Sequence, residues 1–261
     1  MASISADDVQ SFYETNGYFL ARGVFTQEML VQMESAFDQV VARLQQDPQL
    51  NNARWDGPQM DILDGGSSVI LHTHNIQSYS GVWMQALVDN RFLDVAEAIL
   101  GPDVILHHSK LFFKPSEKGS PFPMHQDWEH FPTQQDRMVA AVIHLSDTDE
   151  SSGCLRLYPG SHRNGRLQGM RGDGDDYVPR DDFRVENATP VPAKSGDVLF
   201  FSYLMVHGST PNRSSLPRKT VLVQLHPGSD RVVSGNHHTN VKIALRGMNH
   251  HSSRHVMGRI R

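Results

Sequence analysis

The chain adopts the two-residue period of β-strands at VILHHSKLFF, residues 104–113, and this stretch decides the fold class. Further short β-rich runs follow it at residues 138–145, 154–158, 198–203 and 221–226. Turn sequences such as Lys-Pro, Ser-Gly and Pro-Gly separate these runs. Because no helices alternate with the strands, we expect an antiparallel sandwich or jelly roll rather than a doubly wound sheet.

The part of the chain before this stretch is predicted to be helical. Ser5 is suited to cap a first helix that ends at Gly17, and Thr26 to cap a second. A third helix is predicted over residues 81–100, where Gly-Pro follows its end. We therefore expect a mainly β domain with flanking α-helices over residues 1–261: a mostly helical support layer (1–102), a jelly-roll core (103–230) and a C-terminal tail (231–261).

Composition excludes several classes of protein. The chain has 24 Lys and Arg against 29 Asp and Glu, a net charge of -5, which argues against a nucleic-acid or membrane-surface partner. It has no apolar run near the ~20 residues of a membrane helix and begins with no secretory signal. Cys154 is the single cysteine, so no disulfide framework forms and a reducing cytoplasm is expected. No pattern specifies an oligomeric state.

Fifteen histidines raise a metal hypothesis, and two short motifs locate it. In Met124-His125-Gln126-Asp127, the imidazole and the carboxylate are two residues apart and so share one face of a strand. His207 follows an apolar run, and 79 residues separate it from Asp127. Each motif alone has an ordinary interpretation, as a chance match or a hydrogen-bonded core histidine. Two histidines and one carboxylate together are the facial triad of non-haem iron(II) oxygenases.

An arginine completes the chemistry of such a site. The triad leaves iron positions free for a bidentate keto acid and O2. If the keto acid is a dicarboxylate, its far carboxylate suits a guanidinium and a hydroxyl. Arg218 lies eleven residues beyond His207, and Ser209 shares the face of His207 if the strand continues. Alone, Arg218 would be interpreted as a solvated surface charge.

Motifs spread along the chain carry a family resemblance. They are FYETNGY (12–18), RGVF (22–25), KP (114–115), MHQD (124–127), SGCL (152–155), PGSH (159–162), SGDVLFF (195–201), HGS (207–209) and Asn212. In these motifs and in their order, the sequence resembles the phytanoyl-CoA dioxygenase family of Fe(II)/2-oxoglutarate-dependent oxygenases over nearly its whole length.

The resemblance implies a fold, a cofactor set and residue roles. The fold is a double-stranded β-helix (jelly-roll, cupin-like). Iron(II) is implied on His125, Asp127 and His207, and the far carboxylate of 2-oxoglutarate on Arg218 and Ser209. O2 would split 2-oxoglutarate into succinate and CO2 while the substrate is oxidised. Related halogenases carry a small residue in place of the aspartate, so Asp127 favours hydroxylation over halogenation.

Four further residues are candidates for contacts inside the site. Lys110 and His108 share one strand face by alternation, and ectoine hydroxylases are similar in this stretch. Lys110 is a candidate cosubstrate or substrate contact, with a surface lysine as the alternative. Trp128 and Phe131 follow the metal motif, and we expect one of them to face the substrate, with core packing as the alternative. The polar, Gly-rich segment 163–184 is either disordered or a lid.

The leading hypothesis is hydroxylation of an unactivated C–H bond in a small molecule, of secondary-metabolite or acyl type. A second hypothesis keeps the site but changes the outcome to desaturation, epoxidation, cyclisation or epimerisation, because the pose of the substrate decides it. A third is a cupin-like metal-binding protein without oxygenase activity, against which the arginine and serine argue.

Overall fold

The computed structural model describes residues 5–46, 71–117, 119–169, 181–233 and 240–253. Its strands are β1 (Tyr18–Ala21), β2 (Leu71–His74), β3 (Val104–Lys114), β4 (Phe122–His125), β5 (Val139–His144), β6 (Leu155–Leu157), β7 (Thr189–Pro190), β8 (Val198–Ser202), β9 (His207–Ser209), β10 (Arg218–Pro227) and β11 (Ile243–Arg246). Its α-helices are α1 (Ala6–Asn16), α2 (Gln27–Gln46), α4 (Gly81–Leu87) and α5 (Asn90–Leu100).

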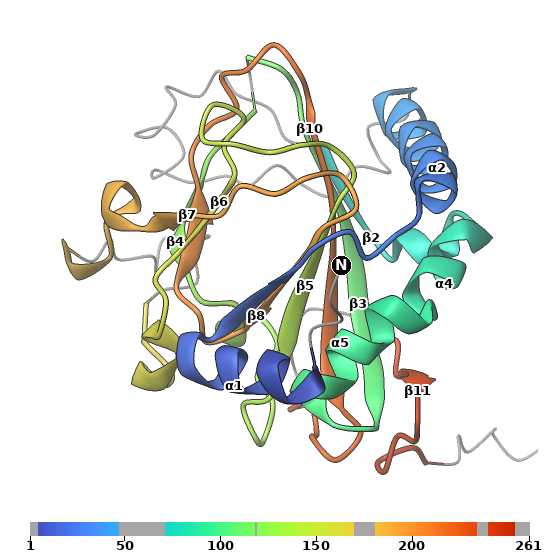
Figure 1. Ribbon diagram of the computed structural model, residues 1–261, viewed down its shortest axis with the longest axis vertical. Helices are drawn as coiled ribbons and strands as arrows, with labels where there is room; N and C mark the ends of the chain where they lie inside the picture. Colours follow the sequence, from blue (N-terminus) through green and yellow to red (C-terminus); the bar gives the residue numbers. More distant parts are fainter. Residues whose placement is uncertain (1–4, 47–70, 118, 170–180, 234–239, 254–261) are drawn as a thin grey trace, which may run out of the picture.

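The strands form two antiparallel sheets that face each other (Figure 1). The larger sheet has the order β1-β8-β5-β10-β3-β11, with β2 also paired to β3. The smaller sheet has the order β4-β9-β6-β7. This is the double-stranded β-helix that the sequence predicted.

The N-terminal helices begin and end largely where the sequence predicts. Ser5 accepts a hydrogen bond from the Asp8 amide at 3.1 Å, and Gly17 ends α1 in the left-handed region at φ 77°. The single helix predicted over residues 81–100 is wrong, because two helices occupy it. Asp89 interrupts it by accepting a hydrogen bond from the Arg91 amide at 2.9 Å, which caps α5.

Segments outside residues 103–230 also contribute strands. β1 pairs with β8, with Tyr18 opposite Phe201, and β2 pairs with the end of β3. In the segment expected to be a tail, β11 pairs with the beginning of β3. The large sheet is therefore wider than the core predicted from period alone. In the described part of the chain, no helix has the length and apolarity to cross a membrane.

The two faces of the large sheet have different neighbours. One face packs against α2, α4 and α5 and forms the main core, with Phe37, Trp83 and Phe92 completely buried. Each such side chain contributes roughly 1.5–3 kcal/mol by leaving water. The other face meets the small sheet through Val142, Phe201 and their neighbours. The space between the sheets holds the site described below.

A β-bulge in β3 changes the alternation on this inner face. His108 pairs with Gln224 of β10, but the next residue pair is Leu106 with Leu225, so β3 contains one extra residue. His107 is that residue, and its Nδ1 atom lies 2.6 Å from Nδ1 of His108. Both imidazole rings contact the ring of Phe131, with centroids 5.3 and 5.2 Å away.

Candidate metal centre and cosubstrate pocket

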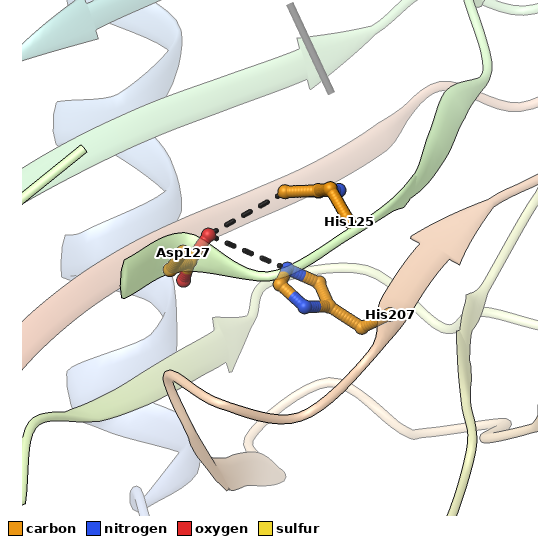
Figure 2. Close-up of side chains that lie close together, drawn as sticks. All are labelled: His125, Asp127 and His207. Atoms are coloured by element: carbon orange, nitrogen blue, oxygen red, sulfur yellow. Dashed lines mark ion pairs between the residues drawn. The ribbon is translucent and has the colours of Figure 1, made fainter. Parts of the chain in front are cut away.

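Three side chains converge between the sheets (Figure 2). His125 ends β4, Asp127 begins a short 3-10 turn (Asp127–Glu129), and His207 begins β9. Asp127 Oδ1 lies 3.4 Å from Nε2 of His125 and 3.6 Å from Nε2 of His207. The strands β4 and β9 place His125 directly opposite His207. Among the described residues, this buried group is the one whose ligand atoms meet as they do in a metal site, all within 4.8 Å of one another.

A glycine allows the two metal-bearing strands to approach. Gly208 lies between His207 and Ser209 on β9. A Cβ atom there would lie 2.7 Å from the Phe122 carbonyl oxygen and 2.8 Å from the Met124 sulfur, both on β4. Any side chain at this position would therefore push β9 away from β4 and separate the two histidines.

Each candidate ligand is oriented by a second hydrogen bond. Nδ1 of His125 lies 2.8 Å from the Pro123 carbonyl, and Nδ1 of His207 lies 2.9 Å from the Met205 carbonyl. Because a carbonyl only accepts, each Nδ1 carries the proton and each Nε2 keeps its lone pair for a metal. Asp127 Oδ2 accepts a hydrogen bond from the side-chain amide of Gln224 at 2.8 Å. Two nitrogen donors and one oxygen donor, oriented in this way, fit iron(II).

The electrostatics of the group also suit a cation. Burial lowers the pKa of His207 to about 4 and so keeps the imidazole neutral. Burial alone would raise the pKa of Asp127, but the positive charge that His207 and His125 carry in their protonated forms outweighs it and holds that pKa below its ordinary value, so the carboxylate stays ionised. A neutral imidazole and an ionised carboxylate are the forms that bind metals.

A second polar group lies next to the metal centre on the large sheet. The register of β3 and β10 places Lys114 opposite Arg218. Lys114 Nζ donates to Ser209 Oγ at 2.7 Å and to the Thr210 carbonyl at 3.2 Å, while Arg218 donates to the Gly153 carbonyl. Burial lowers the pKa of Lys114 well below its ordinary value, with the nearby Arg218 charge adding to this, and lowers that of Arg218 to about 10.

These two buried cations form no ion pair with a carboxylate among the described residues. Desolvating two positive charges side by side is costly unless an anion compensates them. We call Lys114, Ser209 and Arg218 the cation pocket. Its hydroxyl and cations are the groups that a carboxylate would meet there.

The sequence prediction named a different lysine. Lys110 lies on the same strand as Lys114, faces Leu222 of β10, and places its Nζ 4.8 Å from the ring of Phe112. Lys114 lies four residues further on and therefore faces the same side of the strand, which was the one signal in the sequence that could have identified it. The sequence alone does not single out Lys114, because a Lys-Pro pair at the end of a strand resembles a surface turn. The structure thus places Lys114 beside Arg218 and Ser209 as a third candidate contact for the cosubstrate. A role for Lys110 in binding cosubstrate or substrate stays a prediction.

The candidate substrate residues are linked through Phe131. The rings of His108 and Phe131 contact each other beside the bulge in β3. Phe131 also belongs to the hydrophobic cluster in which Trp128 packs with Tyr203 and Leu204. The guanidinium of Arg166 lies 5.0 Å from the Trp128 ring. These contacts match the packing alternative that the sequence left open for Trp128.

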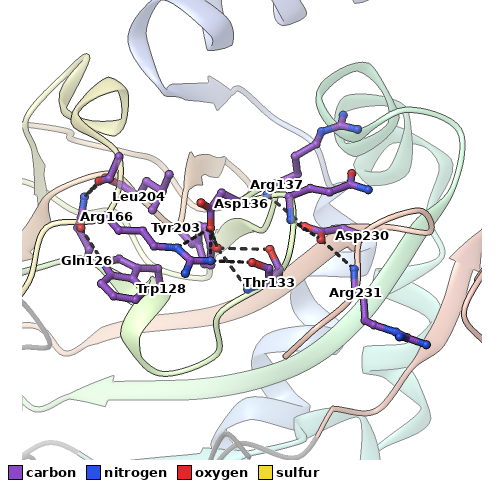
Figure 3. Close-up of polar contacts among 12 residues, drawn as sticks. Gln126, Trp128, Thr133, Asp136, Arg137, Arg166, Tyr203, Leu204, Asp230 and Arg231 are labelled. Atoms are coloured by element: carbon purple, nitrogen blue, oxygen red, sulfur yellow. Dashed lines mark hydrogen bonds and ion pairs between the residues drawn. The ribbon is translucent and has the colours of Figure 1, made fainter. Parts of the chain in front are cut away.

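A hydrogen-bond network secures the metal-bearing turn from behind (Figure 3). Gln126 donates to the carbonyls of Leu204 at 2.5 Å and Gly165 at 3.0 Å, and its amide oxygen accepts from the Trp128 indole at 2.9 Å. Arg166 bonds to Asp136 at 2.8 Å. The beginning of the Gly-rich segment is therefore anchored to the metal motif, and residues 170–180 of that segment lie outside the described residues.

Comparison with known proteins agrees with the motif resemblance. A family model described as phytanoyl-CoA dioxygenase matches residues 13–220, most of the chain. The chain belongs to the phytanoyl-CoA dioxygenase family. It is 28% identical over 246 residues to the ectoine dioxygenase of Bordetella parapertussis, covering 85% of this chain and 75% of that protein. It is 24% identical over 235 residues to the peroxisomal phytanoyl-CoA dioxygenase of Rattus norvegicus, covering 84% and 67%.

Solved structures share the fold of this family member. EctD from S. alaskensis, with 2-oxoglutarate and 5-hydroxyectoine, has a TM-score of 0.67 and 24% identity over 88% of this chain and 78% of that chain. The epimerase SnoN, in complex with Fe3+, α-ketoglutarate and nogalamycin RO, has a TM-score of 0.71 and 18% identity over 94% and 96%. As a phytanoyl-CoA dioxygenase family member, the protein is an iron- and 2-oxoglutarate-dependent oxygenase. Its fold is shared by an epimerase, a carbocyclase and a monooxygenase, so the fold leaves the outcome of oxidation open.

Proposed function

We propose that the protein hydroxylates an unactivated C–H bond of a small molecule and uses iron(II), 2-oxoglutarate and O2. The observation that carries this proposal is the pairing of a pre-oriented triad with a buried cation pocket. Ser209, two residues beyond the ligand His207, links the two groups by its bond to Lys114. His125, Asp127 and His207 would hold the iron, and Arg218, Ser209 and Lys114 the far carboxylate of 2-oxoglutarate.

Each group of side chains has a distinct task in this reaction. Iron(II) held by these residues would be chelated by the keto-acid end of 2-oxoglutarate and would supply the chemistry of O2, and the overall reaction would release succinate and CO2 with hydroxylated product. His125 and His207 supply neutral nitrogen donors, and Asp127 supplies one negative charge. Arg218 and Lys114 neutralise the distal carboxylate, and the buried setting strengthens that attraction by excluding water.

The substrate proposal stays with the small-molecule class. His108 and Phe131 supply an imidazole and an aromatic ring beside the bulge, which suits a secondary metabolite or an acyl-type group. The relatives named ectoine dioxygenase also act on a small molecule. The net charge of -5 offers no attraction for nucleic acid. Since Cys154 is buried and unpaired, a cytoplasmic setting is proposed.

Succinate formation tests the proposal. Purified protein with iron(II) and 2-oxoglutarate under O2 should produce succinate, and a His125→Ala variant should not. A His250→Ala variant, which changes a partly exposed histidine bonded to Asp103, should keep the activity and serves as the control. Unchanged turnover in His125→Ala would refute the ligand assignment.

The mass of the product separates insertion of oxygen from the outcomes that insert none. Hydroxylation and epoxidation add one oxygen atom, desaturation and cyclisation remove two hydrogens, and epimerisation leaves the mass unchanged. A substrate that loses hydrogen or keeps its mass would contradict the proposed hydroxylation while leaving the iron site in place.

A further inference from the structure

Gln224 connects the metal centre to the large sheet. It lies on β10, between His108 of β3 and Ala140 of β5, and is completely buried. The β-bulge begins at this position, where β3 accommodates its extra residue. Bulges beside active sites commonly redirect a side chain. Here Gln224 Nε2 reaches across the interior and lies 2.8 Å from Asp127 Oδ2.

The direction of this amide follows from chemistry. The carboxylate of Asp127 is ionised and can only accept hydrogen bonds, so the NH2 group of Gln224 must face it. The amide oxygen of Gln224 then points away and has no hydrogen-bond partner among the described residues. A buried carbonyl without a partner costs folding free energy. The hydrogen bond from Gln224 to Asp127 is the interaction that offsets this unfavourable contribution.

The three ligands differ in where their second partner comes from. His125 and His207 bond to carbonyls two residues earlier in their own segments. Asp127 alone takes its partner from the opposite sheet. The bond occupies Oδ2, while Oδ1 faces both imidazoles. A carboxylate in this position presents one oxygen to a metal, whereas a rotated carboxylate would present both.

We propose that Gln224 is a positioning residue that commits Asp127 to binding iron through one oxygen, and so keeps metal positions open for the keto acid and O2. The inference rests on the proposed function. It also assigns β10 two tasks, because Arg218 at its beginning belongs to the cation pocket and Gln224 near its end holds the metal ligand.

Cobalt(II) is a suitable probe, because its visible absorption reports both affinity and coordination number. Metal-free protein would be titrated with Co(II) without O2, and the loaded protein then titrated with 2-oxoglutarate. Gln224→Met keeps the length of the side chain but removes the donor. Gln224→Glu keeps the shape but turns an acceptor toward Asp127. Leu222→Met changes an apolar residue two positions away on the same face of β10, removes no side-chain hydrogen bond, and serves as the control.

We expect Gln224→Met to bind Co(II) about 10- to 100-fold more weakly, the usual effect of losing the hydrogen-bond partner of a ligand. Its Co(II) spectrum should also change, because the carboxylate is free to rotate, and Gln224→Glu should change the spectrum too. A defect confined to packing would lower the melting temperature without changing the spectrum. Unaltered spectra and affinities in both folded variants would overturn the assignment of Gln224. If the unchanged protein bound no Co(II), the proposed function would fail and this inference with it.

Discussion

The metal centre and the cation pocket are built on opposite principles. The candidate metal ligands lie on or beside the small sheet, and the second polar atom of each already has a partner within the chain. Lys114 and Arg218 of the cation pocket lie on the large sheet, are both buried, and form no ion pair with an acidic side chain among the residues that the structure describes. The chain thus orients its metal ligands in advance, while the cation pocket is completed by its ligand. Substitutions in the metal centre should therefore abolish metal binding and turnover. Substitutions in the cation pocket should lower the affinity for 2-oxoglutarate to different extents.

The largest effect is expected from Asp127→Ala. This change removes the one negative ligand, so metal affinity should fall by more than the ~100-fold that loss of a ligand's hydrogen-bond partner can cost. Titration with Co(II) measures this, with the exposed Asp147→Ala as a control. Near-normal metal binding in Asp127→Ala would contradict the assignment of Asp127 as a metal ligand, and with it the difference drawn between the metal centre and the cation pocket.

Arg218→Met should come second. Removing one partner of a buried charge pair costs about 2–5 kcal/mol, so the affinity for 2-oxoglutarate should fall roughly 30-fold to several thousand-fold. Calorimetric titration of the Co(II)-loaded protein with 2-oxoglutarate measures this. Lys219→Met is the matched control, because Lys219 pairs with Glu34 and Asp38 outside the pocket. Loss of metal with 2-oxoglutarate binding intact would contradict the role of Arg218.

Lys114→Met should have a smaller effect on the same titration. A hydrogen bond to a charged group contributes about 1.5–3 kcal/mol, which corresponds to about a 10- to 150-fold loss of affinity for 2-oxoglutarate. Metal affinity should stay unchanged. Lys110→Met gives the sharpest comparison, because an equal loss there would show that the lysine nearer the bulge also binds the cosubstrate.

Lys114 should also give the stability a pH dependence. Its pKa is lowered in the folded protein by burial and by Arg218, whereas the unfolded chain has the ordinary value of 10.5. Between these two values the unfolded chain binds more protons, so the free energy of unfolding should rise with pH through this window. Lys114→Met should reduce that slope, and so should 2-oxoglutarate, which stabilises the charged lysine. Urea unfolding at several pH values measures it, and an equal slope in the variant would contradict the lowered pKa of Lys114 in the folded protein.

The smallest effect is expected from Trp128→Phe, behind both groups. It removes the indole donor to Gln126, a neutral hydrogen bond that contributes about 0.5–1.5 kcal/mol. The melting temperature should therefore fall by a few degrees, while Co(II) and 2-oxoglutarate affinities stay unchanged. A selective loss of substrate-stimulated turnover would instead support a contact between Trp128 and the substrate.

The sequence predicted the triad because its chemistry is local. His125 and Asp127 belong to one tetrapeptide, and residue type alone restricts what they bind. The local structure differs in detail, since β4 ends at His125 and Asp127 begins a 3-10 turn. The carboxylate still meets the imidazoles, because the Asp127 amide donates to the Tyr203 carbonyl at 2.9 Å and brings the turn against the segment before His207.

The parts that the sequence left undecided depend on contacts between distant segments. Lys110 and Lys114 have the same strand parity, and only the register of β3 against β10 distinguishes them. The alternation predicted for His108 and Lys110 lies after the bulge and is kept, but nothing in the sequence predicts the extra residue at His107. Gln224 is an ordinary polar residue in an apolar run, and nothing nearby in sequence signals its bond to Asp127.

The bond between Lys114 and Ser209 has one more consequence, because it crosses from β3 in the large sheet to β9 in the small sheet. It fixes the separation of the two walls at the point where one end of a dicarboxylate would stop. If 2-oxoglutarate spans from the candidate metal centre to this bond, a keto diacid shorter by one methylene group would reach only one of its two anchors. The distance between the two sheets, rather than any single side chain, would then determine which length of keto diacid binds.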